Sequence, residues 1–267
     1  QTKAVVRMNS LGTCKDNVFI VHPIDGTMQM LEELVRNLDA NIYGIECVME
    51  APIESIEKLA EYYLNEIKNV QPTGPYKIAG YTFGASVAFE LALQLEKQNE
   101  KVSLLLLLDG SPRLNQTLTQ IYTQDDLSNE KQNTIILKII SQYMPIPFNV
   151  YTSMSKCPSQ KEKLNYAVTV VHESSPHVSI DDIYVVISGY LRRIESAIIY
   201  EPSSKVKSKA VLVKCTKSSI SEDIAWDYGL SEICEEAVDI IEVDGSHNCF
   251  FENPLETGLP KILNKIL

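Results

Sequence analysis

The chain has little of what marks several specialised classes of protein. Lys and Arg number 24 against 35 Asp and Glu, which gives a formal charge of −11. Contacts with nucleic acid phosphates need clustered cationic side chains, so this balance excludes a nucleic-acid-binding role, and it also disfavours an anionic membrane surface. Long hydrophobic runs are missing too. The longest, Leu104 to Leu108, has the length of a strand, whereas a membrane-spanning helix needs roughly 18 apolar residues in a row.

Paired cysteines and metal-ligand spacings are also missing. The six cysteines lie far apart, without a Cys-x-x-Cys pair or histidines at metal-ligand spacing. We therefore expect no metal and no resident cofactor, and free thiols in a cytoplasmic protein. The chain starts at Gln1 without a signal peptide, and we expect it to be a segment of a longer protein.

Short apolar runs alternate with amphipathic segments along much of the 267 residues. This pattern predicts a mostly parallel sheet whose two faces are covered by helices. The apolar residues from Ile56 to Ile67 recur at helical spacing, as do those from Val87 to Leu95. Seven strands are predicted, at Ala4–Met8, Val18–Val21, Ile42–Cys47, Lys77–Tyr81, Leu104–Leu108, Lys209–Cys215 and Ile240–Val243.

The alternation stops between residues 114 and 200, where the pattern becomes helical. Helices are expected near Asn133–Tyr143, Lys161–Val171 and Asp181–Ile199. A helical insertion between the strands of an α/β core is most simply a lid. The expected division is a core of residues 1–113 and 201–267 with a lid of residues 114–200.

The segment Gly80-Tyr81-Thr82-Phe83-Gly84-Ala85 joins a predicted strand to a predicted helix. It matches the Gly-x-Ser-x-Gly nucleophile elbow, with threonine at the serine position. The small flanking residues allow the backbone to turn tightly. The alternative is a glycine-lined turn that merely packs a strand on a helix. Ser86 is a weaker candidate nucleophile, because it should lie inside the first turn of that helix.

Two further residues favour the catalytic interpretation. Asp109 follows the strand Leu104–Leu108, and His247 follows the strand Ile240–Val243. Sites of open α/β sheets lie at the carboxyl ends of the strands, and the order hydroxyl, acid, histidine is that of α/β-hydrolases. Asp223 is the fallback acid, since many of these enzymes carry the acid one strand later.

Thr82, Asp109 and His247 would together supply acyl-transfer chemistry. The imidazole of His247 would take the proton of the attacking Thr82 hydroxyl. Asp109 would fix the tautomer of the ring and stabilise its cationic form. The backbone N–H groups of Phe83 and Ile24 are expected to bind the oxyanion that develops on the substrate.

Several segments together resemble the thioesterase domain that ends animal fatty acid synthases. The similarity runs from about Met8 to the C-terminus and includes an acid only 109 − 82 = 27 residues after the nucleophile position. The resemblance implies an α/β-hydrolase fold with a mostly parallel sheet and a helical lid insertion. The segments that carry it are His22-Pro23-Ile24-Asp25-Gly26, Gln71 to Tyr81, Gly84 to Glu90, Asp109-Gly110-Ser111-Pro112 and Gly245-Ser246-His247.

The resemblance also implies a reaction, the hydrolysis of a long-chain acyl thioester. The acyl group would be carried on the phosphopantetheine of an acyl carrier protein domain of the same synthase, and a free fatty acid would be released. Thioesterases of polyketide or nonribosomal peptide synthases are an alternative that the detailed match of the loops disfavours. The side chains expected to contact the acyl chain are Tyr81, Ile187, Leu191 and Ile198.

Thr82 departs from the serine of the family. An elbow nucleophile has a positive φ, which β-branched residues avoid, so threonine costs on the order of 1–3 kcal/mol of strain. We therefore expect slow turnover. A catalytically impaired acyl-binding module is the remaining alternative. Phe83 and Asn248 also depart from the tyrosine and arginine that related chains often carry.

Overall fold

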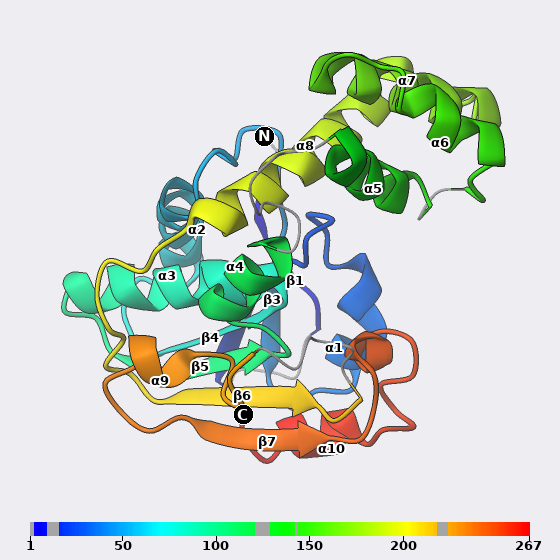
Figure 1. Ribbon diagram of the computed structural model, residues 1–267. Coiled ribbons are helices and arrows are strands. Elements are labelled where there is room, and N and C mark those ends of the chain that lie inside the picture. The colour runs from blue at the N-terminus through cyan, green and yellow to red at the C-terminus, as the bar shows by residue number, and fades with distance from the viewer. Residues whose placement is uncertain (1–2, 10–15, 121–128, 142–143, 218–223) are drawn as a thin grey trace. The chain divides into compact units, whose positions relative to one another are not determined.

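The computed structural model describes residues 3–9, 16–120, 129–141, 144–217 and 224–267. One seven-stranded sheet has the order β1-β3-β2-β4-β5-β6-β7 (Figure 1). β1 is antiparallel to β3, and the other pairs are parallel. The seven predicted strands are thereby confirmed, within a few residues at their ends. They are β1 Val5–Arg7, β2 Asn17–Val21, β3 Asn41–Ile45, β4 Tyr76–Tyr81, β5 Val102–Leu108, β6 Ala210–Cys215 and β7 Asp239–Val243.

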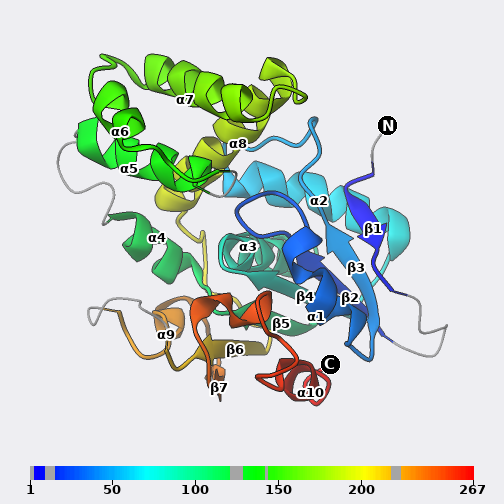
Figure 2. The ribbon, with the colours of Figure 1, turned by 90° about the vertical axis from the view of Figure 1, so that its right-hand side faces the viewer.

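The central strands are apolar on both faces because both faces are covered. In β5, the run Leu104–Leu108 is buried throughout, as expected for a parallel strand between two helical layers. Alternate residues of β2, β4 and β5 share a core with α1 (Glu32–Arg36) and α10 (Leu259–Leu263). The opposite face packs against α3 (Phe83–Lys97), which in turn packs on α2 (Ile56–Val70) (Figure 2).

The two long core helices follow from their sequences in different ways. α2 is amphipathic and begins where the Ser55 hydroxyl accepts a hydrogen bond from the Lys58 N–H at 3.2 Å. α3 is apolar on nearly every side, because it lies between the sheet and α2. Several shorter helical segments of this part of the chain were not predicted: η1 (Gln29–Leu31), α1, α4 (Pro112–Gln120), α9 (Leu230–Ile233), η2 (His247–Phe250) and α10.

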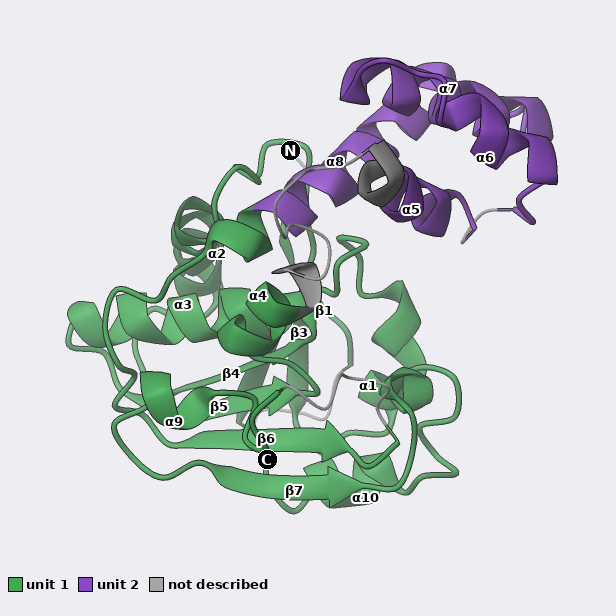
Figure 3. Cartoon of the chain, viewed as in Figure 1, with its two compact units in different colours: residues 1–117, 196–267 green, residues 118–195 purple. Residues whose placement is uncertain are grey.

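The chain divides into two compact units (Figure 3). The first contains the sheet and comprises residues 1–117 and 196–267, and the second comprises residues 118–195. The predicted insertion, residues 114–200, has bounds close to these. The chain passes between the units within α4 (Pro112–Gln120) and within α8 (Ile180–Ile199).

The second unit has an apolar core of its own. α5 (Asn129–Ile140), α7 (Gln160–Ser174) and α8 overlap the three helices predicted there, while α6 (Phe148–Met154) was not predicted. Ile136, Ile140, Val168 and Ile187 are among its buried residues. In the described part of the chain, no helix is long and apolar enough to cross a membrane.

Candidate active site

Thr82 lies at a sharp turn between β4 and α3. Its backbone has φ 48° and ψ −108°, a conformation that β-branched residues rarely adopt. Two glycines make the turn possible. A Cβ at Gly80 would lie 2.0 Å from the Gly84 carbonyl oxygen, and a Cβ at Gly84 would lie 2.6 Å from the His22 carbonyl oxygen. The geometry is that of a nucleophile elbow, as the sequence predicts.

The polar groups of Thr82 are all engaged. Its hydroxyl oxygen accepts a hydrogen bond from the N–H of Phe83, the group predicted to bind an oxyanion. Its carbonyl oxygen accepts one from the Ala85 N–H at 3.0 Å and one from the Asn115 side-chain amide at 2.9 Å. Asn115 lies on α4 and was not singled out from the sequence. It fixes the elbow from outside the strand and helix that form it.

Asp109 and His247 form a close pair. Asp109 Oδ2 lies 2.6 Å from His247 Nδ1, with the carboxylate fully buried and the imidazole 34% exposed. Asp109 Oδ1 accepts hydrogen bonds from the Cys215 N–H at 3.1 Å and the Tyr228 hydroxyl at 2.8 Å. The predicted acid and the predicted base are therefore in direct contact, although 138 residues separate them.

The Asp109 carboxylate stays ionised despite its burial. Burial alone raises the pKa of this group, but the hydrogen bond and charge of His247 and the donors from Cys215 and Tyr228 outweigh it, so the pKa lies below its usual value. An ionised carboxylate can only accept hydrogen bonds. His247 therefore donates from Nδ1, which leaves Nε2 free to take a proton.

The sheet register brings Thr82 and Asp109 to one edge. The Thr82 N–H donates to the Leu108 carbonyl at 3.1 Å, and the Asp109 N–H donates to the Val213 carbonyl at 2.8 Å, so both residues leave adjacent strands at the same level. A Cβ at Gly110 would lie 2.8 Å from Thr82 Cα. In the described part of the chain, the Thr82 hydroxyl oxygen accepts its hydrogen bond from the Phe83 N–H and not from His247.

Tyr81 stacks against the imidazole of His247. The ring centroids of Tyr81 and His247 are 5.1 Å apart and nearly parallel, and the Tyr81 hydroxyl donates to the His247 carbonyl at 2.8 Å. Burial raises the pKa of this phenol, which keeps its proton for that bond. The residue is 2% exposed. This place under His247 differs from the substrate contact that the sequence analysis predicts.

The loop that follows β2 packs on the elbow. His22 is buried, its Nδ1 donates to the Pro23 carbonyl at 2.6 Å, and Nε2 accepts from the Tyr63 hydroxyl at 2.8 Å. Its ring stacks on Phe83 with centroids 5.7 Å apart. His22 thus shapes the loop. Ile24 is half-buried in it, and its role as an oxyanion donor stays a prediction.

The remaining candidates fall elsewhere. Ser86 is fully buried and accepts a hydrogen bond from the Asn115 amide at 2.7 Å, so it is not presented to substrate. Asp223 lies outside the described residues. Ile187 and Leu191 belong to the apolar core of the second unit, which differs from the groove position predicted for them. Ile198 is half-buried, and its contact with an acyl chain stays a prediction.

Two features next to the triad were missed at the level of sequence. Tyr228, which bonds to Asp109, is 119 residues away from it in the chain. The buried sulfurs of Cys215 and Cys249 lie 3.4 Å apart, and these residues flank the acid and the histidine. No local sequence motif predicts either contact. Within the described residues, no group of three or more His, Cys, Asp or Glu could share a metal ion.

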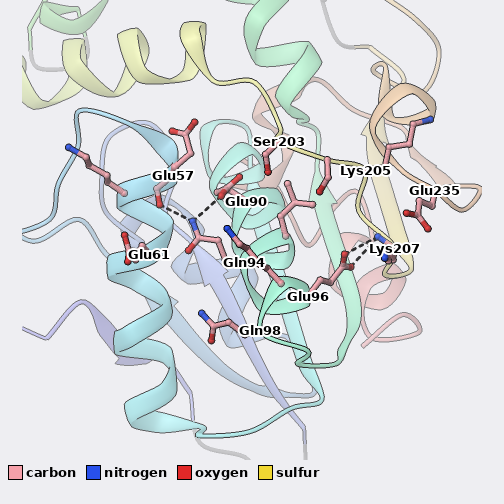
Figure 4. A pocket seen from close by; sticks show the side chains of 14 residues that line it. Glu57, Glu61, Glu90, Gln94, Glu96, Gln98, Ser203, Lys205, Lys207 and Glu235 are labelled. Carbon is pink, nitrogen blue, oxygen red and sulfur yellow. Dashed lines mark hydrogen bonds between the residues drawn. The ribbon is translucent and has the colours of Figure 1, made fainter.

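A separate cavity of about 1100 Å³ lies beside α2 and α3, with Glu90, Gln94 and Glu96 in its wall (Figure 4). Neither Thr82, Asp109 nor His247 lines it. The Glu90 carboxylate is 5% exposed and accepts hydrogen bonds from the Tyr200 hydroxyl at 2.7 Å and the Gln94 amide at 2.9 Å.

The profile of the thioesterase domain family matches residues 16–262. The chain belongs to this family. A thioesterase domain cleaves thioester bonds, and this one has a hydroxyl residue at a strained strand-to-helix turn and a histidine bonded to a buried carboxylate. The fold is accordingly the α/β-hydrolase fold that the sequence predicts.

Curated relatives of this thioesterase domain are large synthases. The nonribosomal peptide synthetase pngA of Aspergillus terreus is 38% identical over 118 residues, 42% of this chain and 12% of the relative. Indigoidine synthase of Streptomyces lavendulae is 29% identical over 221 residues, 79% of this chain and 16% of the relative. Polyketide synthase PksR of Bacillus subtilis is 32% identical over 100 residues, 36% of this chain and 4% of the relative. The chain thus spans a small part of each.

Solved structures agree on the fold. A four-domain nonribosomal peptide synthetase bound to AMP and glycine matches 99% of this chain with a TM-score of 0.80 and 18% identity, over 20% of its own length. The Vlm2 thioesterase domain matches 98% of this chain and 96% of its own, with a TM-score of 0.61 and 18% identity. These relatives belong to peptide and polyketide assembly, not to the fatty acid synthase branch that the loop motifs resemble.

Proposed function

We propose that this domain releases a carrier-bound acyl or peptidyl chain from a synthase of the nonribosomal peptide or polyketide type, with Thr82 as nucleophile, His247 as base and Asp109 as the acid that orients it. The contact of 2.6 Å between Asp109 and His247, beside the left-handed Thr82 elbow, carries this proposal. The relatives' names support the kind of synthase. The substrate would arrive as a thioester on the arm of a carrier-protein domain.

The reaction takes two steps. In the first, Thr82 Oγ1 attacks the thioester carbonyl carbon while His247 Nε2 takes the hydroxyl proton. The C–S bond then breaks, and the thiol leaves with that proton, so the acyl group remains as an ester of Thr82. In the second step, water, or a nucleophile within the acyl chain, attacks the ester with His247 again as base. The products are a free acid or a ring, and Thr82 regains its proton.

Two properties of threonine and one hydrogen bond of its hydroxyl slow this sequence. The residue already holds a strained backbone, on the order of 1–3 kcal/mol, and its γ-methyl group lies beside the attacking oxygen. In addition, the hydroxyl oxygen occupies the Phe83 N–H. That N–H is the predicted oxyanion donor, so the hydroxyl must leave it before the donor can stabilise the transition state.

The test is the substitution Thr82→Ser. We expect turnover of acyl and peptidyl pantetheine thioesters to rise on the order of tenfold to a hundredfold, because the strain and the methyl group are relieved. Thr82→Ala should abolish the covalent acyl intermediate in mass spectra, whereas Ser86→Ala should retain it. If Thr82→Ser is no faster than the unsubstituted chain, position 82 is not the nucleophile.

A fatty acid synthase thioesterase is the second candidate, favoured by the motifs His22 to Gly26 and Gln71 to Glu90. The same assay separates the two, with Thr82→Ser supplied with palmitoyl and with peptidyl or β-hydroxyacyl thioesters. A higher kcat/KM on palmitoyl thioester with a linear fatty acid as product would support the fatty acid synthase branch. Tight binding of thioesters without turnover in either protein would instead indicate an acyl-binding module.

A further inference from the structure

Tyr228 is the third side chain that bonds to the Asp109–His247 pair. Its hydroxyl donates to Asp109 Oδ1 at 2.8 Å, next to the Cys215 N–H at 3.1 Å on the same oxygen. The other oxygen, Oδ2, faces the imidazole at 2.6 Å. The carboxylate is therefore held from both sides, with two donors opposite the histidine.

The backbone of Tyr228 is held as firmly as its hydroxyl. Its carbonyl accepts a hydrogen bond from the Ser111 hydroxyl at 2.6 Å, and its N–H donates to the Ala225 carbonyl at 2.8 Å. Ser111 belongs to the same turn as Asp109, so the turn that carries the acid also anchors the residue that bonds to it. Tyr228 is 4% exposed.

Tyr228 has a strained backbone, as Thr82 and Asp109 do. Its φ is 55°, in the left-handed region that non-glycine residues avoid. Of the four non-glycine residues with positive φ in the described part of the chain, three are Thr82, Asp109 and Tyr228. Such strain persists where the surroundings fix it and gathers at active sites. Tyr228 follows this pattern, whereas a tyrosine that merely fills space would not need it.

We propose that Tyr228 is a positioning residue for thioester cleavage: its hydroxyl fixes the rotation of the Asp109 carboxylate so that Oδ2 points at His247 Nδ1. This inference rests on the proposed function. Without the Tyr228 hydroxyl, Asp109 Oδ1 keeps only the Cys215 N–H as a donor. The carboxylate can then rotate about χ2, which moves Oδ2 away from the imidazole of His247. The imidazole then spends less time in the orientation that aims Nε2 at Thr82.

The test compares Tyr228→Phe with Tyr200→Phe. Both tyrosines are buried and both donate to a buried carboxylate, at 2.8 Å and 2.7 Å, but Tyr200 bonds to Glu90, away from the triad. In the full chain with Thr82→Ser, which should give measurable rates, we expect Tyr228→Phe to lower kcat roughly tenfold with KM unchanged. Tyr200→Phe should leave both constants unchanged. Equal kcat in the two variants would overturn the proposal.

The pH dependence of kcat distinguishes a positioning role of Tyr228 from a merely structural one. Loss of the Tyr228 donor raises the pKa of Asp109, because one of the groups that lowers it is gone. The acidic limb of kcat against pH should therefore move to higher pH in Tyr228→Phe and not in Tyr200→Phe. The other titratable groups that act on Asp109 or its partners here are His247, Tyr81, Cys215, Cys249 and Lys214.

Failure of the inference and failure of the proposed function give different results. Asp109→Asn in the same background tests the function, and unchanged turnover in it would overturn the triad. If the enzyme proves inactive on every thioester, proton NMR still tests Tyr228, through the downfield resonance of the His247 Nδ1 proton. We expect this resonance to shift in Tyr228→Phe, to disappear in Asp109→Asn and to stay in Tyr200→Phe. A resonance unmoved in Tyr228→Phe would overturn the positioning role.

Discussion

Asp109 and Glu90 are two carboxylates buried in the same unit, and the groups around them differ. Both are at most 5% exposed, and each accepts a hydrogen bond from a buried tyrosine, Tyr228 or Tyr200. Yet the pKa of Asp109 lies below its usual value, and that of Glu90 lies above. Burial raises the pKa in both cases and is the largest single influence on each.

The partners explain the difference. Asp109 adds a histidine that can carry positive charge and a backbone N–H to its tyrosine, and together they outweigh burial. Glu90 has the Tyr200 hydroxyl and the Gln94 amide, and the nearby charge of Glu57 opposes its ionisation. A histidine in direct contact therefore keeps the buried Asp109 carboxylate ionised, whereas the hydroxyl and amide donors of Glu90 and the more distant charge of Lys97 do not offset its burial.

Distance along α3 separates the two regions. Glu90 lies 90 − 82 = 8 residues after Thr82, which corresponds to about 12 Å along a helix. It lines a cavity with charged walls, beside Glu57 and Glu96 (Figure 4). The helix that starts at the elbow thus runs from the catalytic edge of the sheet to a polar cavity without catalytic geometry.

The strongest test of this difference between Asp109 and Glu90 is to neutralise each carboxylate in turn. We expect Asp109→Asn to lower thioester turnover on the order of 10⁴-fold, since the imidazole loses both its partner's charge and its tautomer. Glu90→Gln should leave turnover unchanged. Steady-state rates in the Thr82→Ser background measure both, and a large loss of turnover in Glu90→Gln would show that the two regions are not independent.

The pH dependence of stability gives a smaller contrast. Asp109, with its pKa lowered by folding, stabilises the fold above its unfolded pKa, about 3.9, and this contribution is lost as the pH falls through the folded value. Glu90, with its pKa raised, stabilises below about 4.3 and loses that contribution as the pH rises through its folded value. Relative to the chain with Glu90, Glu90→Gln should therefore be more favourable to the fold at neutral pH than at acid pH.

Urea unfolding of Glu90→Gln and of the natural chain at pH 4 and pH 7 measures this difference. The gain should be present at pH 7 and smaller at pH 4, where Glu90 is mostly protonated in both states. A variant equally stabilised at both pH values would contradict an ionisation effect. Gln98→Leu, in the wall of the same cavity, controls for changes of the surface there.

The smallest expected effect concerns Gln94. Its amide donates to Glu90 Oε1 and to the Glu57 carbonyl, both at 2.9 Å. Gln94→Leu should raise the pKa of Glu90 further and cost about 1 kcal/mol of stability through the lost hydrogen bonds, with turnover unchanged. An NMR titration of the Glu90 carboxyl carbon measures the direction of the pKa shift, and a downward shift would contradict the role assigned to the amide.

Local patterns predicted much of this molecule. The apolar runs located all seven strands, because a strand between two helical layers needs apolar residues on both faces. The elbow motif located the turn at Thr82, and the residues after β5 and β7 located the Asp109–His247 contact, since small residues and strand ends can be recognised in a sequence. Tyr228 and Asn115 could not be predicted. The contact of Tyr228 with Asp109 spans 119 residues and that of Asn115 with Thr82 spans 33, and no local sequence pattern marks either.

The sequence motifs also did not predict the type of synthase. The segments around Thr82, Asp109 and His247 serve the elbow and the acid turn, which every hydroxyl-dependent thioesterase needs. They identify the family and say little about the substrate, which depends on the shape of the acyl groove. This is why loops that resemble fatty acid synthase occur in a chain whose curated relatives assemble peptides and polyketides. Likewise, the motif predicts a substrate contact for Tyr81, which is buried in the fold.

The loop that carries Tyr228 also carries the one tryptophan of the chain. Trp226 is 61% exposed, and the Lys214 ammonium lies 3.6 Å from the centre of its ring and donates to its carbonyl at 2.9 Å. Its fluorescence therefore comes from a single place, two residues from the phenol that bonds to the catalytic acid. Emission and quenching of this indole would report, without any added dye, whether that loop rearranges when a thioester binds.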